Sequence, residues 1–371
     1  MEVKMFLRCF VLRCFIGLFF SILAVNGYSG TLDAVRQQFE IYQRFPGEIE
    51  ILSTDDLSEI DNVLARTEAK RLTVREELDK ALRERQPNKD LPSPLFAEVS
   101  LPPFMYYVAV ERAHARRSLA QDKPDEVAES IRYVYHLAEE LSLSGSLEWR
   151  AAAARIRLQM LETAQSLLLH PRCRKEHHEA LHKIFENQIN RRTTDAVIWT
   201  RYREEGKQFF AGIGQHGLDK MVSPELLKEL MDRDAFSGYE KAMARRTAHD
   251  RSVFHRVSEA VIESCSVPFF QRQPVLRQLE HELRTQRGTA AEPVFALLLL
   301  RDVSRYMQLF AQERSGIELA YLALSASLGK HNHNNTMQNF LTGREYEIRL
   351  ITDGVMCTYE GNIKPFYVPY R

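Results

Sequence analysis

The chain has 371 residues, enough for one large helical domain or two ordinary ones, and enough to bury a sizeable apolar core. Its composition, 44% hydrophobic and 27% charged, is close to the globular average and excludes a wholly disordered chain. The 50 basic residues equal the 50 acidic ones and both signs are mixed along the chain. This balance predicts no nucleic-acid partner, because nucleic-acid binding needs a clustered basic surface.

Residues 1–27 have the composition of an export segment. Basic residues precede an uncharged apolar run at 15–25, and small polar residues follow it, which is typical of a secretory signal peptide. The run is shorter than the roughly 20 residues that cross a bilayer, but residues 5–25 would span if Arg8 and Arg13 extended to the headgroups. We expect either a cleaved signal peptide or a retained anchor. In both cases the protein is extracytoplasmic: periplasmic, secreted or held at the cell membrane by its N-terminus.

An N-terminal helical arm is predicted over residues 28–86. A short helix at 31–45 is followed by a long one, which begins at a cluster of capping residues near Thr54 and has apolar positions at three- and four-residue spacing. Residues 87–103 hold five prolines. Proline removes a backbone donor and fixes φ, so this range is expected to be a linker.

The predicted helical body, residues 104–342, is divided by prolines, glycines and capping residues. Pro274 is expected to begin one helix, and Gly316 to interrupt the last. Short connections favour a multi-helix bundle or an irregular α-solenoid, and no fixed repeat period is present. A helix carries the segment after Arg174, and the other expected helices lie at 104–120, 124–142, 146–169, 194–213, from 223 onward, 236–264 with a break, 274–286 and 291–328.

In residues 343–371 the pattern of apolar residues changes from helical spacing to the alternation typical of strands. Apolar and charged residues alternate around Ile348, the pattern of a half-buried strand, and Asp353 with Gly354 has the composition of a two-residue hairpin turn. A type I′ turn there would need positive φ at Gly354. The predicted fold class is therefore mainly α, with a small C-terminal β-hairpin or meander that packs on the helices.

One short motif suggests catalysis. Residues 178–182, His-Glu-Ala-Leu-His, match the H-E-x-x-H pattern of zinc peptidases, in which two histidines at i and i+4 bind zinc and the glutamate activates water. In this chain the ligands would be His178 and His182 and the base Glu179. Glu204 or Glu205, on the next predicted helix, would be the third ligand.

Several features weigh against the zinc interpretation. The resemblance covers only five residues, and Lys183 follows the second histidine where an uncharged residue is usual. Phe185 and Gln188 occupy the positions of the glycine and third histidine of the extended motif, and no strand is predicted before residue 174. The alternative is structural: the two histidines lie at the edge of an apolar helix face and form hydrogen bonds with a neighbouring helix.

The remaining polar groups form no complete catalytic set. Cys173, Cys265 and Cys357 are too few for a disulfide framework, and three thiols that act as small apolar residues are favoured over one disulfide. His331 and His333 are expected in a polar loop, since no Cys, Asp or Glu lies close by in the sequence. Three arginine pairs are expected on solvated helix faces: Arg116 and Arg117, Arg191 and Arg192, and Arg245 and Arg246.

The sequence as a whole favours an extracytoplasmic protein-interaction or scaffold module without catalytic activity. Its expected partner is another protein of the cell envelope, with no nucleic acid and no cofactor, and with membrane contact only through residues 5–25 if they are retained. The alternative is a zinc-dependent hydrolase, a peptidase, that uses residues 178–182.

Overall fold

The computed structural model describes residues 35, 37–39, 51–53, 57–84, 101–143, 147–216, 243–287, 292–300, 302–330, 337–360 and 364–371. Several predictions fall outside these residues: the export segment at 1–27, most of the proline-rich linker, the helix expected from 223, and the loop histidines His331 and His333. The linker's last residues, from Leu101 on, are described and form the first turn of a helix.

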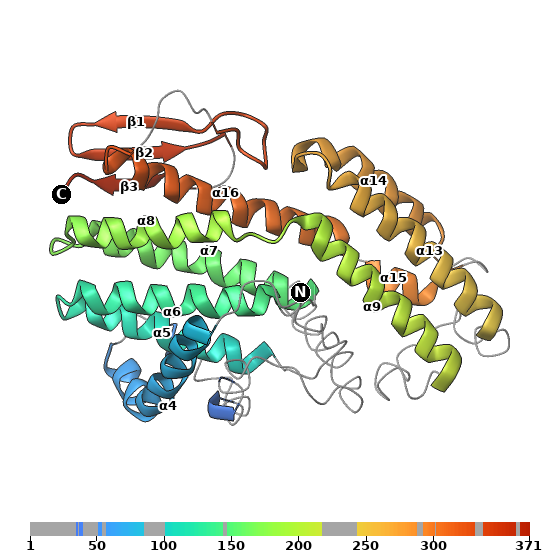
Figure 1. Ribbon diagram of the computed structural model, residues 1–371, viewed down its shortest axis with the longest axis horizontal. Coiled ribbons are helices and arrows are strands. Elements are labelled where there is room, and N and C mark those ends of the chain that lie inside the picture. The colour runs from blue at the N-terminus through green and yellow to red at the C-terminus, as the bar shows by residue number, and fades with distance from the viewer. Residues whose placement is uncertain are drawn as a thin grey trace.

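The described chain is mainly helical with a small antiparallel sheet at its C-terminal end, which confirms the predicted fold class (Figure 1). None of the described helices is both long and apolar enough to cross a membrane. The helices are α4 (Leu57–Glu84), α5 (Leu101–Ala120), α6 (Pro124–Leu143), α7 (Leu147–Leu169), α8 (Lys175–Asn190), α9 (Asp195–His216), α13 (Met243–Ser264), α14 (Phe269–Thr285), α15 (Val294–Leu300) and α16 (Val303–Ser327). The strands are β1 (Glu347–Ile351), β2 (Gly354–Thr358) and β3 (Phe366–Pro369).

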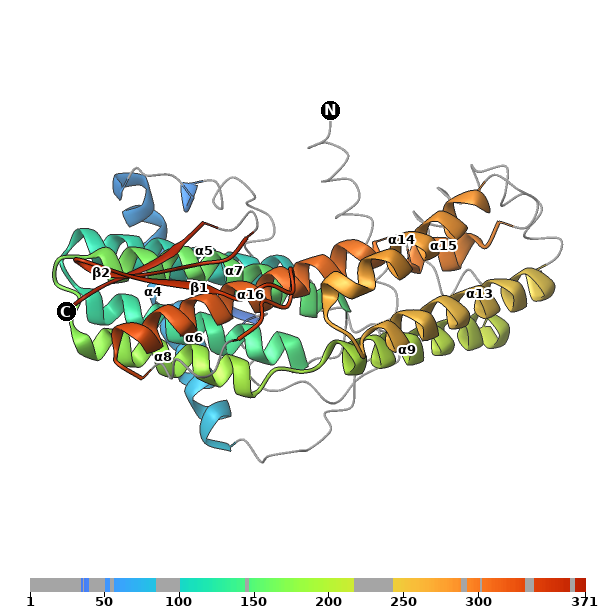
Figure 2. The same ribbon diagram turned by 90° about the horizontal axis from the view of Figure 1, so that it is seen from above.

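Two apolar cores lie end to end along the long axis of the molecule (Figures 1 and 2). The first core is built by α4 to α8, the C-terminal half of α16 and the sheet. The second core is built by α9, α13, α14 and α15 together with the N-terminal parts of α7 and α16. Because α7 and α16 contribute to both cores, these two helices join the halves of the molecule.

Helices α7 and α16 approach each other closely at a glycine. A Cβ at Gly316 would lie 2.8 Å from the side chain of Leu161 and 3.3 Å from that of Leu158. The prediction that Gly316 interrupts the last helix was wrong, because the glycine serves helix packing within α16. The interruption lies earlier, between α15 and α16.

Two other helix boundaries differ from the predicted ones. Helix α14 begins at Phe269, after Pro268 at its N-cap, and Pro274 lies inside it. Helix α9 continues past Gly212 and Gly214 to His216. In both cases a local helix breaker is tolerated because the helix packs against the second core along its length.

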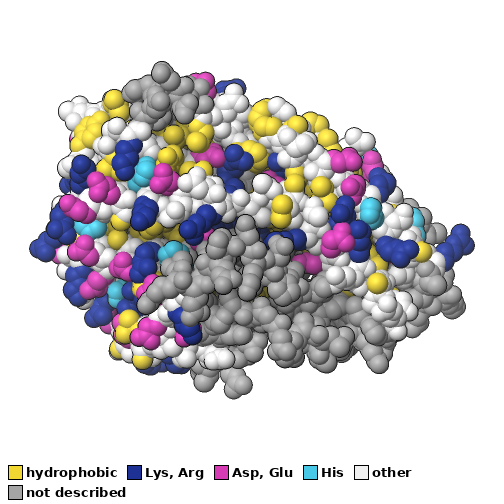
Figure 3. All heavy atoms as spheres, viewed as in Figure 1, with side chains coloured by type: hydrophobic (Ala, Val, Ile, Leu, Met, Phe, Trp, Pro, Cys, Tyr) yellow, Lys and Arg dark blue, Asp and Glu magenta, His cyan; other side chains and the backbone are white. Residues whose placement is uncertain are grey.

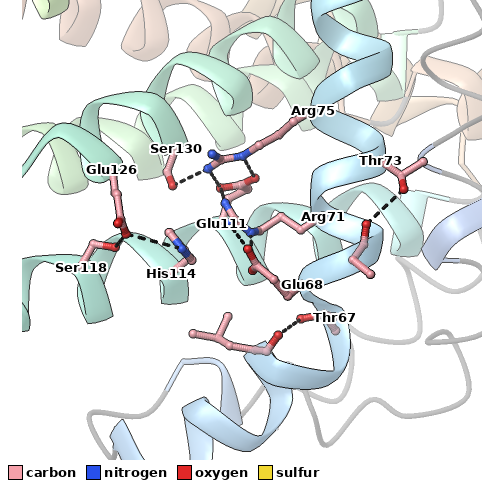
Figure 4. A network of polar contacts seen from close by, with 12 residues as sticks. Thr67, Glu68, Arg71, Thr73, Arg75, Glu111, His114, Ser118, Glu126 and Ser130 are labelled. Atoms are coloured by element: carbon pink, nitrogen blue, oxygen red, sulfur yellow. Dashed lines mark hydrogen bonds and ion pairs between the residues drawn. The ribbon is translucent and has the colours of Figure 1, made fainter. Parts of the chain in front are cut away.

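A buried charge network fixes α4 to the helical body (Figure 4). Glu111 of α5 is fully buried and accepts two hydrogen bonds from Arg75 of α4, at 2.8 and 2.6 Å, while Arg71 lies 3.4 Å away. Burial opposes ionisation of Glu111, but the hydrogen bonds and charges of the two arginines outweigh it and hold its pKa below the usual value. Arg75 also donates to Ser130 of α6 at 2.9 Å, so one guanidinium joins three helices.

The C-terminal sheet is a meander with strand order β1-β2-β3. Ile351 pairs with Gly354, so the two turn residues are Thr352 and Asp353. The expected positive φ at Gly354 was wrong, because among the described residues only Gly329 and Gly343 are glycines with positive φ. Gly354 is required for a different reason: a Cβ there would lie 2.5 Å from the carbonyl oxygen of Val368 on β3.

Candidate functional site

The H-E-x-x-H residues lie in the first turns of α8, next to the C-terminal end of α16. The N-terminus of α8 is closed by His177, whose Nδ1 accepts the backbone N–H of Arg174 at 2.8 Å. The other nitrogen of this ring, Nε2, lies 2.9 Å from a carboxylate oxygen of Asp125 on α6. The preceding histidine therefore fixes the start and the direction of the helix that carries the motif.

His178 and His182 are buried between α8 and α16. Nε2 of His182 lies 3.0 Å from Oγ of Ser325, and its ring packs on Tyr321 with centroids 4.9 Å apart. Nδ1 of His178 lies 3.4 Å from Oγ of Ser327. Burial lowers the pKa of both histidines, to about 4 for His178, so both rings are neutral at neutral pH.

Glu179 points away from this contact. Its side chain is 51% exposed and its carboxylate lies 4.0 Å from the ammonium of Lys175, one turn earlier on the same helix. This is the arrangement of a solvated surface pair.

Within the described part of the chain, no third metal ligand lies beside the two histidines. Among the described residues, no three His, Cys, Asp or Glu side chains form a group that could hold a metal ion. Glu204 on α9 binds Arg203 and Lys207, at 3.1 and 2.8 Å, and Glu205 is buried on the same helix. Nε2 of His182 and Nδ1 of His178 each contact a serine of α16, whereas Nε2 of His178 is buried without a hydrogen-bond partner in the described part of the chain.

The three cysteines of the described chain are free thiols. Burial raises the pKa of Cys173 to about 11 and that of Cys265 and Cys357 to about 12. All three are therefore protonated at neutral pH, and a protonated thiol is a poor nucleophile.

A cavity lined by arginines lies where the two cores meet. Three guanidinium groups converge on Glu313 of α16, which is fully buried: those of Arg150, Arg157 and Arg192, at 2.7, 3.1 and 3.0 Å. The adjoining space has a volume of about 20 Å³ and is open to solvent. We call it the arginine cavity; its charged lining residues are Glu139, Arg150, Arg157, Arg191, Arg192 and Glu313.

The sequence analysis did not identify the arginine cavity. It placed Arg191 and Arg192 on a solvated face, whereas Arg192 is largely buried and bound to Glu313. One signal was present: Arg150 and Arg157 are seven residues apart in an alanine-rich segment, so they share a helix face that is otherwise apolar. Their acidic partner lies more than 150 residues away and is not identifiable from the sequence.

The two edges of the C-terminal sheet differ. The outer edge of β3 is closed by the side chain of Gln165 on α7, which accepts the N–H of Tyr367 at 2.9 Å and donates to its carbonyl at 2.6 Å. The outer edge of β1 pairs with no other described strand. This edge also carries two exposed apolar side chains, Leu350 and Ile351.

Comparison with known proteins found no matching family model, no similar curated protein and no similar solved structure. A function for this chain has to come from its own geometry.

Proposed function

We propose that this protein is a non-catalytic interaction module of the cell envelope that binds an extended segment of another envelope protein along β1. The observation that carries the proposal is the difference between the two sheet edges: Gln165 closes the edge of β3, whereas no strand among the described residues pairs with the outer edge of β1. The composition of residues 1–27 supports the extracytoplasmic location.

Backbone groups of β1 are available for an added strand. In a two-residue hairpin the pair that flanks the turn, here Ile351 and Gly354, is hydrogen-bonded, and bonded and non-bonded pairs then alternate. By this alternation Ile348 and Leu350 direct their N–H and C=O groups away from β2. Such unpaired groups are a template for β-augmentation, in which a partner's main chain supplies the missing hydrogen bonds.

The side chains of β1 give this edge an apolar contact surface. Leu350 lies opposite Val355 in the register, so both point to the same face of the sheet. Val355 is fully buried, whereas Leu350 is 62% exposed, so β1 extends beyond the helices that cover β2. An extended partner segment would bury Leu350 and pair with the backbone at the same time.

The charges on and around β1 favour a specific partner over non-specific association. Glu347 and Arg349 on this strand form an ion pair with each other at 2.6 Å, and charges on an edge strand limit edge-to-edge aggregation. Elsewhere the visible surface mixes both signs of charge (Figure 3). Affinity would therefore come from main-chain pairing and apolar contact at β1.

The test is site-specific photo-crosslinking in the native host. A photoreactive residue in place of Ile351 should give one major adduct with an envelope protein, and the same residue in place of Leu72, an exposed position on α4, should not. Leu350→Pro in the Ile351 background should remove the adduct, because proline deletes the outward N–H without breaking a bond to β2. Leu350→Val, which keeps the N–H and an apolar side chain, should retain it.

Either of two results would overturn this proposal. The first is the lack of any adduct at position 351. The second is an adduct that Leu350→Pro leaves unchanged while the variant keeps the melting temperature of the parent protein.

A further inference from the structure

A shallow depression with a basic lining lies on the exposed face of α13, at the end of the molecule opposite the C-terminal sheet (Figures 1 and 2). It is open to solvent and has a volume of about 580 Å³. The described residues that line it are Lys207 of α9 and, on one face of α13, Ala248, Arg251, Ser252, His255 and Arg256. No carboxylate is among them.

Several cationic side chains of this face have no partner in the described part of the chain. Arg251 and His255 are exposed, and neither forms a hydrogen bond or an ion pair with a described residue. Arg245, nearly two turns before Arg251, is exposed and unpaired in the same way. We call the lining residues together with Arg245 the basic face of α13. A surface that presents one sign of charge attracts groups of the opposite sign.

The remaining two cations of the basic face are bound only by exposed acids outside the depression. Nζ of Lys207 lies 2.8 Å from Glu204, and a guanidinium nitrogen of Arg256 lies 2.8 Å from Glu282 on α14. The two basic side chains are 38% and 53% exposed. Such solvated pairs contribute little free energy, so an acidic ligand can exchange with them.

The composition of the basic face favours a protein segment over a membrane surface. Helices that bind anionic membranes combine basic side chains with large apolar ones that enter the headgroup region. None of the exposed large apolar side chains of the described chain lies on α13. Small side chains, those of Ala248 and Ser252, separate the long basic ones instead, which leaves room for acidic side chains of a partner between them.

We infer that the basic face of α13 binds an acidic segment of a second partner protein. Arg245 and Arg256 are separated by about 16 Å along the helix, at 1.5 Å per residue. An extended segment of about five or six residues matches this length. Because β1 lies at the opposite end of the molecule, the two surfaces would allow one chain to connect two partners (Figure 2).

Fluorescence anisotropy of labelled hexaglutamate, titrated with the purified full-length protein, tests the inference. We expect saturable binding that weakens as the ionic strength rises, because salt screens exposed charges. Arg251→Glu should weaken binding by on the order of fivefold, since it replaces an attraction by a repulsion. Arg251→Lys keeps the charge and should retain the affinity.

A gain of affinity provides a second readout that a folding defect cannot produce. Glu204→Gln removes the carboxylate that competes for Lys207 and should strengthen binding by about twofold. Arg251→Glu should leave the melting temperature unchanged, because Arg251 is exposed and has no partner among the described residues.

Lys183→Glu is the matched control. It makes the same change of net charge at an exposed position of α8, a helix of the first core, and should bind hexaglutamate as the parent protein does. Crosslinking at position 351 reports on β1 and hexaglutamate binding on α13, so each proposal can fail without the other.

Any of three results would show the inference to be wrong. The first is no saturable binding of hexaglutamate at low ionic strength. The second is an equal loss of affinity in Arg251→Glu and Lys183→Glu, because the peptide would then respond to net charge alone. The third is binding to phosphatidylglycerol vesicles that Arg251→Glu abolishes, without binding of hexaglutamate, which would assign the basic face to a membrane surface.

Discussion

At the residue scale, His178 and His182 occupy positions that suit either metal binding or helix packing, and the two roles differ in what Glu179 does. In the packing role Glu179 is a solvated side chain, and Glu179→Gln should change the free energy of unfolding by no more than about 0.5 kcal/mol. His182→Ala should cost about 1–3 kcal/mol, because it removes the contacts with Ser325 and Tyr321. Chemical denaturation of the two variants measures both values.

Zinc distinguishes the two roles directly. For packing, added zinc should leave the melting temperature of the parent protein unchanged. A zinc peptidase would give the opposite set of results: a melting temperature that rises with zinc, and peptide hydrolysis that Glu179→Gln abolishes while the metal stays bound.

Burial of His178 predicts a pH dependence of stability. Its pKa is about 4 in the folded protein and about 6.5 in an unfolded chain, so the unfolded state takes up a proton at higher pH than the folded state does. The contribution of neutral His178 to the free energy of unfolding is therefore complete above pH 6.5 and is lost as the pH falls toward 4. His178→Gln removes the titrating group, so the stability difference between parent and variant should shrink over this range.

Urea denaturation midpoints at pH 7, 6, 5 and 4 measure this difference. His255→Gln, which changes an exposed histidine on α13, is the control. Its urea midpoint should change with pH as that of the parent protein does. Parallel curves for His178→Gln would contradict the prediction, because His178 would then titrate alike in both states.

At the scale of single elements, two glycines predict effects of opposite sign. Gly354→Val should destabilise the protein by about 1–3 kcal/mol, since its Cβ would meet the backbone of Val368 and the ring of Tyr367. Gly214→Ala should stabilise it by about 0.5–1 kcal/mol, because Gly214 lies in α9 with open space around it. Thermal denaturation compares the two, and an unchanged midpoint for Gly354→Val would show that β2 and β3 do not pack in solution as described.

The positions of most elements were predictable because the signals that set them are local. Pro124 in the first turn of α6, with two acidic residues after it, fixed that helix start from the sequence alone. Pro274 and Gly316 gave wrong boundaries for a common reason. A local helix breaker costs about 1–3 kcal/mol, and packing along a whole helix outweighs it.

The candidate sites were predictable only where residues close in sequence form them. The placement of Glu179 away from the helix contact follows from helical periodicity, and the sequence identified the hairpin that forms β1. The arginine cavity combines residues of α6, α7, α8 with the segment after it, and α16, and only the tertiary fold brings them together. Local sequence patterns do not predict contacts between residues so far apart in the chain.

At the scale of the whole molecule, the proposal requires export. A reporter that is active only outside the cytoplasm, fused after Arg371, should be active. Phe19→Asp combined with Leu23→Asp should abolish that activity, because two charges disrupt the apolar run. Leu72→Asp combined with Leu169→Asp adds the same charge at exposed positions and should leave the activity unchanged. Activity that survives Phe19→Asp with Leu23→Asp would refute export through this segment.

The shared helices α7 and α16 have a consequence for how the chain folds. Neither core is complete without α16. The contacts of Arg150 and Arg157 with Glu313 of this helix close loops of 163 and 156 residues. Contacts of such large sequence separation slow folding, because the chain loses loop entropy before they form. During synthesis the first five described helices would therefore expose apolar surface until the last quarter of the chain emerges. A nascent protein of this kind exposes apolar surface for longer than one that folds from its N-terminus, and it is a substrate for chaperones.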